Sequence, residues 1–116
     1  MQVVHLADAD TYDAPRHHGM TALRLQGADA SGSQISIGLS HFLPGGGAER
    51  SASPLDRVYV VIDGEIAVVT DDQDVALRPL DSCWIPAGEM REVTNRTRRP
   101  ASMLVVMATP RDDPHT

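Results

Sequence analysis

The fold is decided by residues 44–64, which run PGGGAERSASPLDRVYVVIDG. The three glycines after Pro44 predict a break in the chain, and the β-branched residues of 57–62 predict a strand. The Asp63-Gly64 pair that follows is typical of a two-residue hairpin turn, so residues 65–70 are expected to return alongside that strand. This stretch therefore predicts short antiparallel strands joined by tight turns.

The rest of the chain continues the same pattern on both sides. Further strands are predicted at residues 3–6, 21–26, 33–43, 75–78, 91–95 and 101–108, with a polar loop at 8–19 and a tail at 109–116. No segment shows a convincing helical period. A closed β architecture is the simplest way to protect so many strand edges, so we expect one all-β domain over residues 1–116.

Composition narrows the classes of function. A length of 116 residues suits one compact domain, and a formal net charge of -6 argues against nucleic acid or a membrane surface as a partner. No apolar run is long enough to cross a bilayer, and residues 1–10 lack the features of a signal peptide, so a cytoplasmic location is expected. The single cysteine, Cys83, excludes an internal disulfide and fits a buried apolar position.

Residues 44–64 and 80–95 resemble the two sequence motifs of the cupin family. Five framework positions match in type and spacing: Gly45, Gly64, Pro86, Gly88 and Asn95. Leu80 stands where the second motif has glycine, and Asp81 follows it. The resemblance covers about residues 35–108 and implies a cupin-like antiparallel β-barrel of the double-stranded β-helix, or jelly-roll, type (RmlC-like). It also implies a homodimer.

The positions that hold metal in the family differ in this chain. The resemblance implies two histidines and a glutamate from the first motif and a histidine from the second, where this chain has Ser51, Ser53, Arg57 and Arg91. A hydroxyl is a poor ligand for a transition metal, and a guanidinium stays protonated and cannot be one. We therefore expect no metal cofactor at the usual site.

Serine and arginine in those positions point to an anion pocket. Arginine presents a planar fork of donors that matches a carboxylate or phosphate. Strand alternation puts Glu49 on the inward face with several of these residues, and the aromatics Tyr59 and Trp84 could stack on a ligand. The expected ligand-binding set, for a small anionic metabolite of carboxylate type, is Ser51, Ser53, Arg57, Tyr59, Trp84 and Arg91. In the alternative, the arginines pair internally with Glu49, Asp56, Glu89 or Glu92.

Two other classes of function stay open. The chain could be a cupin enzyme of isomerase, lyase or dioxygenase type acting on a small carboxylate, with His41 and Glu49 as candidate catalytic acid and base. Such an enzyme could be metal-free, or it could hold a divalent metal at a non-standard site built from His41, Glu49 and either His17 or His18. The third class is a structural or regulatory dimer with a filled barrel, in which residues 3–6 pair with the partner's sheet. The fold hosts many chemistries and does not choose among these.

Overall fold

The computed structural model describes residues 1–109, and most of them lie in β-strands. The elements are η1 (Leu6–Asp8), β1 (Thr11–Tyr12), β2 (His17–Gln26), β3 (Ile35–Ser51), β4 (Arg57–Asp63), β5 (Ile66–Val69), β6 (Asp74–Leu77), β7 (Ser82–Ile85), β8 (Arg91–Thr94) and β9 (Ala101–Ala108). Every strand pairing within this range is antiparallel. The predicted all-β class is confirmed. Over the same range, no helix is long and apolar enough to cross a membrane.

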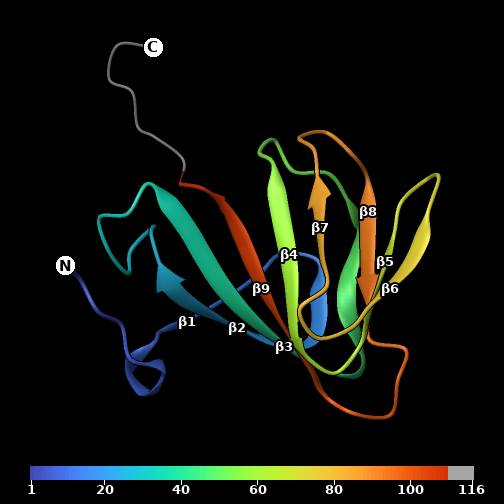
Figure 1. Ribbon diagram of the computed structural model, residues 1–116, viewed down its shortest axis with the longest axis horizontal. Coiled ribbons are helices and arrows are strands. Elements are labelled where there is room, and N and C mark those ends of the chain that lie inside the picture. The colour runs from blue at the N-terminus through green and yellow to red at the C-terminus, as the bar shows by residue number, and fades with distance from the viewer. Residues whose placement is uncertain (110–116) are drawn as a thin grey trace.

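The long strand β3 gives the barrel its shape. The strand order is β6-β5-β8-β3-β9-β4-β7, with β2 paired to β3 and β1 to β2. The first half of β3 pairs with β9, from Ile35 opposite Ala108 onwards, and its last residues pair with β8 up to Ser51 opposite Arg91. Because one strand belongs to both walls, the sheet wraps into a nearly closed antiparallel barrel (Figure 1). The seam lies between β6 and β7, the two ends of that order.

Glycines 45–47 bend β3 and do not break it, so the break predicted after Pro44 is wrong. Gly45 has a φ of 80°, in the left-handed region that favours glycine. A Cβ on Gly46 would lie 2.1 Å from the carbonyl oxygen of Gly19, and one on Gly47 would lie 2.0 Å from that of Val93. The missing side chains let β2 and β8 approach β3 at the point where it turns.

The hairpin predicted at Asp63-Gly64 is also wrong. Strand β4 pairs with β7 and β9, whereas β5 pairs with β6 and β8. Gly64 has a φ of 75°, and a Cβ there would lie 2.7 Å from the carbonyl oxygen of Pro100. At this glycine the chain crosses from one wall of the barrel to the other. The dipeptide marks a tight turn, but it does not determine which strands pair.

The N-terminal region differs from the prediction as well. No strand forms at residues 3–6, where the chain instead leads into η1. The predicted loop at 8–19 contains β1 and the start of β2. Thr109, assigned to the tail, is fixed to the barrel, because its backbone N–H donates to the Gln34 carbonyl at 2.8 Å. The remainder of that tail, residues 110–116, lies outside the described residues.

The core is mostly aliphatic and forms the floor of the cavity described below. Its fully buried side chains include Phe42, Val61, Ile66, Val93 and Met103. Asn95 is buried among them, and its amide nitrogen donates to the carbonyls of Phe42 and Arg99 at 3.3 and 2.7 Å. These bonds tie the loop after β8 to β3, which fixes β8 and the side chains it carries.

Candidate functional site

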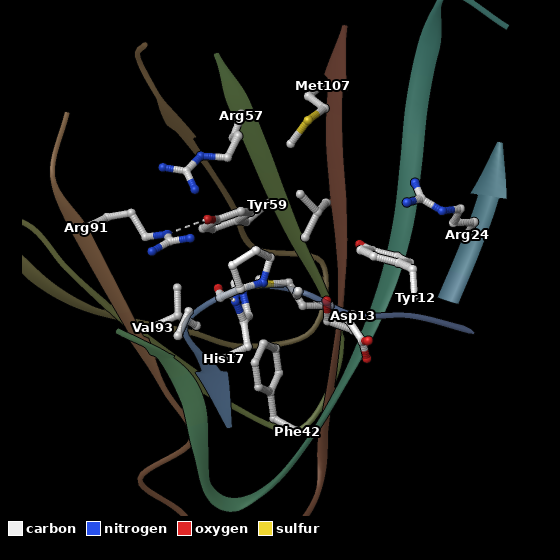
Figure 2. A pocket seen from close by; sticks show the side chains of 16 residues that line it. Tyr12, Asp13, His17, Arg24, Phe42, Arg57, Tyr59, Arg91, Val93 and Met107 are labelled. Atoms are coloured by element: carbon white, nitrogen blue, oxygen red, sulfur yellow. Dashed lines mark hydrogen bonds between the residues drawn. The ribbon is translucent and has the colours of Figure 1, made fainter. Parts of the chain in front are cut away.

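A cavity of about 340 Å³ lies inside the barrel, above the core. Its apolar floor includes Phe42, Val93 and Met103, and its polar lining includes Tyr12, Asp13, His17, Arg24, Ser40, Arg57, Tyr59 and Arg91 (Figure 2). The barrel is therefore not filled, which argues against the predicted alternative of a filled, purely structural barrel.

Arg91 is held rigidly in this cavity. It projects from β8 with 3% of its surface exposed. Its Nε donates to the Tyr59 hydroxyl at 2.7 Å, and its Nη1 donates to the Ser51 hydroxyl and the Glu49 carbonyl, both at 3.0 Å. Three acceptors thus fix the plane of the guanidinium. Since the Tyr59 oxygen accepts from Arg91, its own proton is free to donate to another group.

Arg57, on the neighbouring strand β4, has no such partners. It is 6% exposed, and its Nε and Nη2 are buried without a hydrogen bond. Its guanidinium carbon lies 5.9 Å from the centre of the Tyr59 ring. Burial lowers the pKa of Arg57 from its ordinary value, and the nearby charge of Arg91 acts in the same direction. The guanidinium nevertheless keeps its proton.

Neither buried arginine is neutralised by a carboxylate within residues 1–109. The ion pairs of this region are Arg50–Asp71, Arg78–Glu65 and Arg96–Asp74. Among the predicted internal partners, Glu49 offers only its backbone carbonyl, and the Asp56 carboxylate accepts from the backbone N–H of Ala87. The alternative in which these arginines pair internally is therefore wrong for the described chain.

His17 enters the cavity from the start of β2. Its Nδ1 lies 2.7 Å from the Pro15 carbonyl, which can only accept, so Nδ1 carries the proton. Burial is the main cause of a lowered pKa at His17, and the charges of Arg91, Arg16 and Arg57 lower it further. The ring is therefore neutral near pH 7, with its Nε2 able to accept a hydrogen bond. Sequence reasoning considered His17 only as a metal ligand.

Tyr12 and Arg24 line the side of the cavity opposite Arg57 and Arg91 (Figure 2). The Arg24 guanidinium carbon lies 4.2 Å from the centre of the Tyr12 ring, a cation–π contact. Tyr12 crosses β3 at Gly38, where a Cβ would lie 2.7 Å from the tyrosine hydroxyl oxygen. Burial raises the pKa of that hydroxyl, with Arg24 acting against it. The sequence analysis missed both residues.

Five predicted site residues do not line the cavity, and one of them, Ser51, is linked to it only through its hydrogen bond to Arg91. His41 is exposed, and its Nδ1 lies 2.7 Å from the Ser102 hydroxyl, because Ser40 and Phe42 on either side of it face inward. The Glu49 side chain is also exposed. The Ser53 hydroxyl accepts from the Leu55 N–H within the turn after β3. Trp84 is 63% exposed on the outer face of β7, so it cannot stack on a ligand held by Arg57. His41 and Glu49, the candidate acid and base, therefore do not face the cavity.

The residues at the usual metal positions do not fit a metal ion. Arg57 and Arg91 place two buried cations there, and the Ser51 hydroxyl is already bonded to one of them. The alternative site does not converge either, since His17 lines the cavity while His41 and Glu49 are exposed outside it. Among the described residues, no three histidine, cysteine or acidic side chains are grouped as metal ligands.

Comparisons with known proteins place the chain in a family. A family model described as "Cupin domain" matches residues 38–107. A Mycobacterium tuberculosis protein named Beta-D-galactosidase Rv1717 is 40% identical over 111 residues, which cover 95% of this chain and 96% of that protein.

Solved structures agree with this assignment. A sugar phosphate isomerase of the cupin superfamily from Silicibacter pomeroyi is 31% identical, with a TM-score of 0.70 over 79% of this chain and 60% of that one. The polyketide cyclase RemF from Streptomyces resistomycificus is 19% identical, with a TM-score of 0.82 over 97% of this chain and 82% of that one. An RmlC-like cupin from Shewanella frigidimarina is 16% identical, with a TM-score of 0.79 over 97% and 94%. The chain belongs to the cupin family.

Proposed function

We propose that the cavity binds a small anionic molecule of sugar type, with Arg57 and Arg91 as its anion anchors. The observation that carries the proposal is the buried guanidinium of Arg57, which has two unbonded nitrogens and no carboxylate partner in the described chain. A buried cation without partners is costly. A bound carboxylate or phosphate would supply both the missing charge and the missing acceptors.

Arg57 and Arg91 would have different roles in binding the anion. Nε and Nη2 of Arg57 lie on one edge of the guanidinium and donate in parallel, which suits the two oxygens of a carboxylate. Both nitrogens are shielded from solvent, so a ligand would reach this edge only through a change of the Arg57 rotamer. Arg91 is already oriented by Tyr59, Ser51 and Glu49, so it would act as the fixed anchor. Such preorganisation lowers the entropic cost of binding.

The sugar character of the ligand rests on the relatives and on the lining. The 40% identical relative is named a β-D-galactosidase, and the 31% identical structure is named a sugar phosphate isomerase. His17 Nε2 and the hydroxyls of Ser40, Tyr12 and Tyr59 offer the cavity both acceptors and donors for sugar hydroxyls. A sugar acid or a sugar phosphate satisfies both sets of groups.

Isothermal titration calorimetry with matched probes tests this function. Galactitol and D-galactonate share one carbon skeleton and differ by a carboxylate, and D-galactose 6-phosphate tests the phosphate form against D-galactose. We expect the anions to bind and the neutral partners to bind at least about tenfold more weakly. Arg57→Gln and Arg91→Gln should each weaken anion binding. Arg98→Gln, which removes an exposed cation outside the cavity, is the matched control. Equal affinity for galactitol and galactonate would refute the proposal.

A second candidate function is hydrolysis of β-D-galactosides, favoured by the 40% identity to a protein of that name over 95% of this chain. Glycosidases ordinarily use two carboxylates across the glycosidic bond. Asp13 is the one carboxylate that lines the cavity among the described residues, and it is exposed at the rim. Release of nitrophenol from o-nitrophenyl β-D-galactoside, abolished in Asp13→Asn but kept in Glu49→Gln, would support this function. No release above the rate of a protein-free control would rule it out for this substrate.

A further inference from the structure

We infer that the cavity is built for a dianion, with one anionic group held by Arg57 and Arg91 and a second held by Arg24 on the opposite side. This inference rests on the proposed anion binding and names its substrate class more narrowly. The juxtaposition of three arginines around one cavity carries it, because each of them lacks a carboxylate partner in the described chain.

The strand register places Arg24 across the cavity from the other two arginines. Arg24 on β2 is opposite Gly38 on β3, Gly38 is opposite Val105 on β9, and Val105 is opposite Tyr59 on β4. These four residues form one row on the inner face of the sheet. Three strand spacings separate its ends, roughly 14 Å along the curved sheet. Arg57 occupies the next inward position on β4, so the cationic groups face a common space from two sides (Figure 2).

The guanidinium of Arg24 is also held in position by neighbouring residues, although by stacking and not by hydrogen bonds. Its guanidinium is stacked on the Tyr12 ring at 4.2 Å, and Gly38 leaves the space that lets Tyr12 lie there. The stacking fixes the plane of the guanidinium and leaves its N–H groups without a hydrogen-bonded acceptor in the described chain. An arginine stacked on an aromatic ring with free donors is well prepared for a second carboxylate or phosphate.

Two other titratable groups face this space, and both limit the ligand. Asp13 lines the cavity beside Tyr12 and is exposed, so its charge is screened by solvent but repels an anion at the rim. His17 is neutral and presents an acceptor, which favours a hydroxyl of the ligand over a charged oxygen. A molecule with anionic ends and hydroxyls between them matches this order of groups. Aldaric acids and phosphorylated sugar acids belong to that class.

The test is a charge series on one carbon skeleton: galactitol, D-galactonate and galactarate carry no, one and two carboxylates. Calorimetric titrations near neutral pH and at constant ionic strength compare the wild type with Arg24→Gln, and with Arg98→Gln as the charge-matched control. In the wild type, galactarate should bind about tenfold or more tightly than galactonate. In Arg24→Gln the advantage of galactarate over galactonate should be lost, so that the two acids bind alike.

Each outcome decides between the two proposals. Failure of both acids to bind would overturn the dianion inference, and failure of D-galactose 6-phosphate as well would overturn the proposed function. Binding of galactonate, with galactarate no tighter, would leave the anion site standing and overturn the role of Arg24. An equal loss of affinity for both acids in Arg24→Gln would also overturn it, because it would show that Arg24 only supports the packing of the cavity. Thermal melting of Arg24→Gln establishes that the variant is folded.

Discussion

Replacing Arg57 with methionine should stabilise the free protein. The guanidinium of Arg57 is buried, unpaired and missing two hydrogen bonds, so the folded state carries a penalty that loss of the charge would relieve. Methionine keeps a long, unbranched side chain of adaptable shape and removes the charge. The expected result is a more stable protein that has lost its anion anchor, as in other trade-offs between stability and function.

The size of the effect follows from the contacts of Arg57. An unsatisfied buried donor costs about 1–3 kcal/mol, and Arg57 has two of them. Loss of the contact with the Tyr59 ring, worth about 0.5–1 kcal/mol, offsets part of the gain. The two donors together cost about 2–6 kcal/mol, so a net gain of about 1–5 kcal/mol remains. For a chain of 116 residues, each kcal/mol shifts the Tm by about 4 °C, so the Tm should rise by about 4–20 °C.

The assay is thermal melting in a buffer free of phosphate and carboxylates, since a bound anion would stabilise the wild type and hide the effect. Arg91→Met is the informative comparison. Its loss leaves the Tyr59 hydroxyl, the Ser51 hydroxyl and the Glu49 carbonyl without their donor, so its Tm should fall by at least about 4 °C. A Tm of Arg57→Met at or below the wild type, or a shift of the same sign in both variants, would refute the reasoning.

Three further predictions concern single groups. Gly38→Ala places a methyl group against the Tyr12 hydroxyl and should lower galactarate affinity more than galactonate affinity in calorimetry; equal losses would contradict this. Because the pKa of His17 is lowered by burial, its stabilising contribution is complete above the unfolded value of about 6.5 and is lost as pH falls through the folded value. The drop in Tm between about pH 7.5 and about pH 5.5 should then be larger in the wild type than in His17→Gln, and equal drops would show that other groups are responsible. Burial raises the pKa of the Cys83 thiol, so Ellman's reagent should modify it slowly until denaturant is added; immediate labelling of the folded protein would count against its burial.

Two strands with runs of apolar and β-branched residues could be predicted from the sequence. Strand β9 has the predicted bounds, and β4 extends to Asp63, one residue beyond the prediction. Both have a face buried against the core, and burial on one face produces the period of two. The pairing of β4 could not be predicted, because Asp63-Gly64 has the composition of a local turn while the partners of β4 come from distant parts of the chain.

Part of the candidate site could likewise be predicted from the sequence, and part could not. Arg57, Tyr59 and Arg91 meet in the cavity because the two motifs fix the register of the strands that carry them. Tyr12 comes from a strand of two residues, too short for any sequence pattern to mark. In β2, the leucines suggest the buried face, yet Ala22 is the buried residue and Arg24 shares its face. Only the tertiary position of β2, beside β3, turns Arg24 toward the cavity.

The sharing of β3 between two walls also has a consequence for how the protein folds. The first half of β3 completes its hydrogen bonds only with β9, which follows it by some sixty residues, as the pairing of Gly38 with Val105 shows. Loop-closure entropy must therefore be overcome before most of the stabilising contacts form. We expect slow, all-or-none folding on the millisecond-to-second scale typical of such β topologies. During synthesis, the first half of β3 can pair with β2 but must wait with its other edge unpaired until β9 has been made, which makes this edge the one most in need of protection from aggregation.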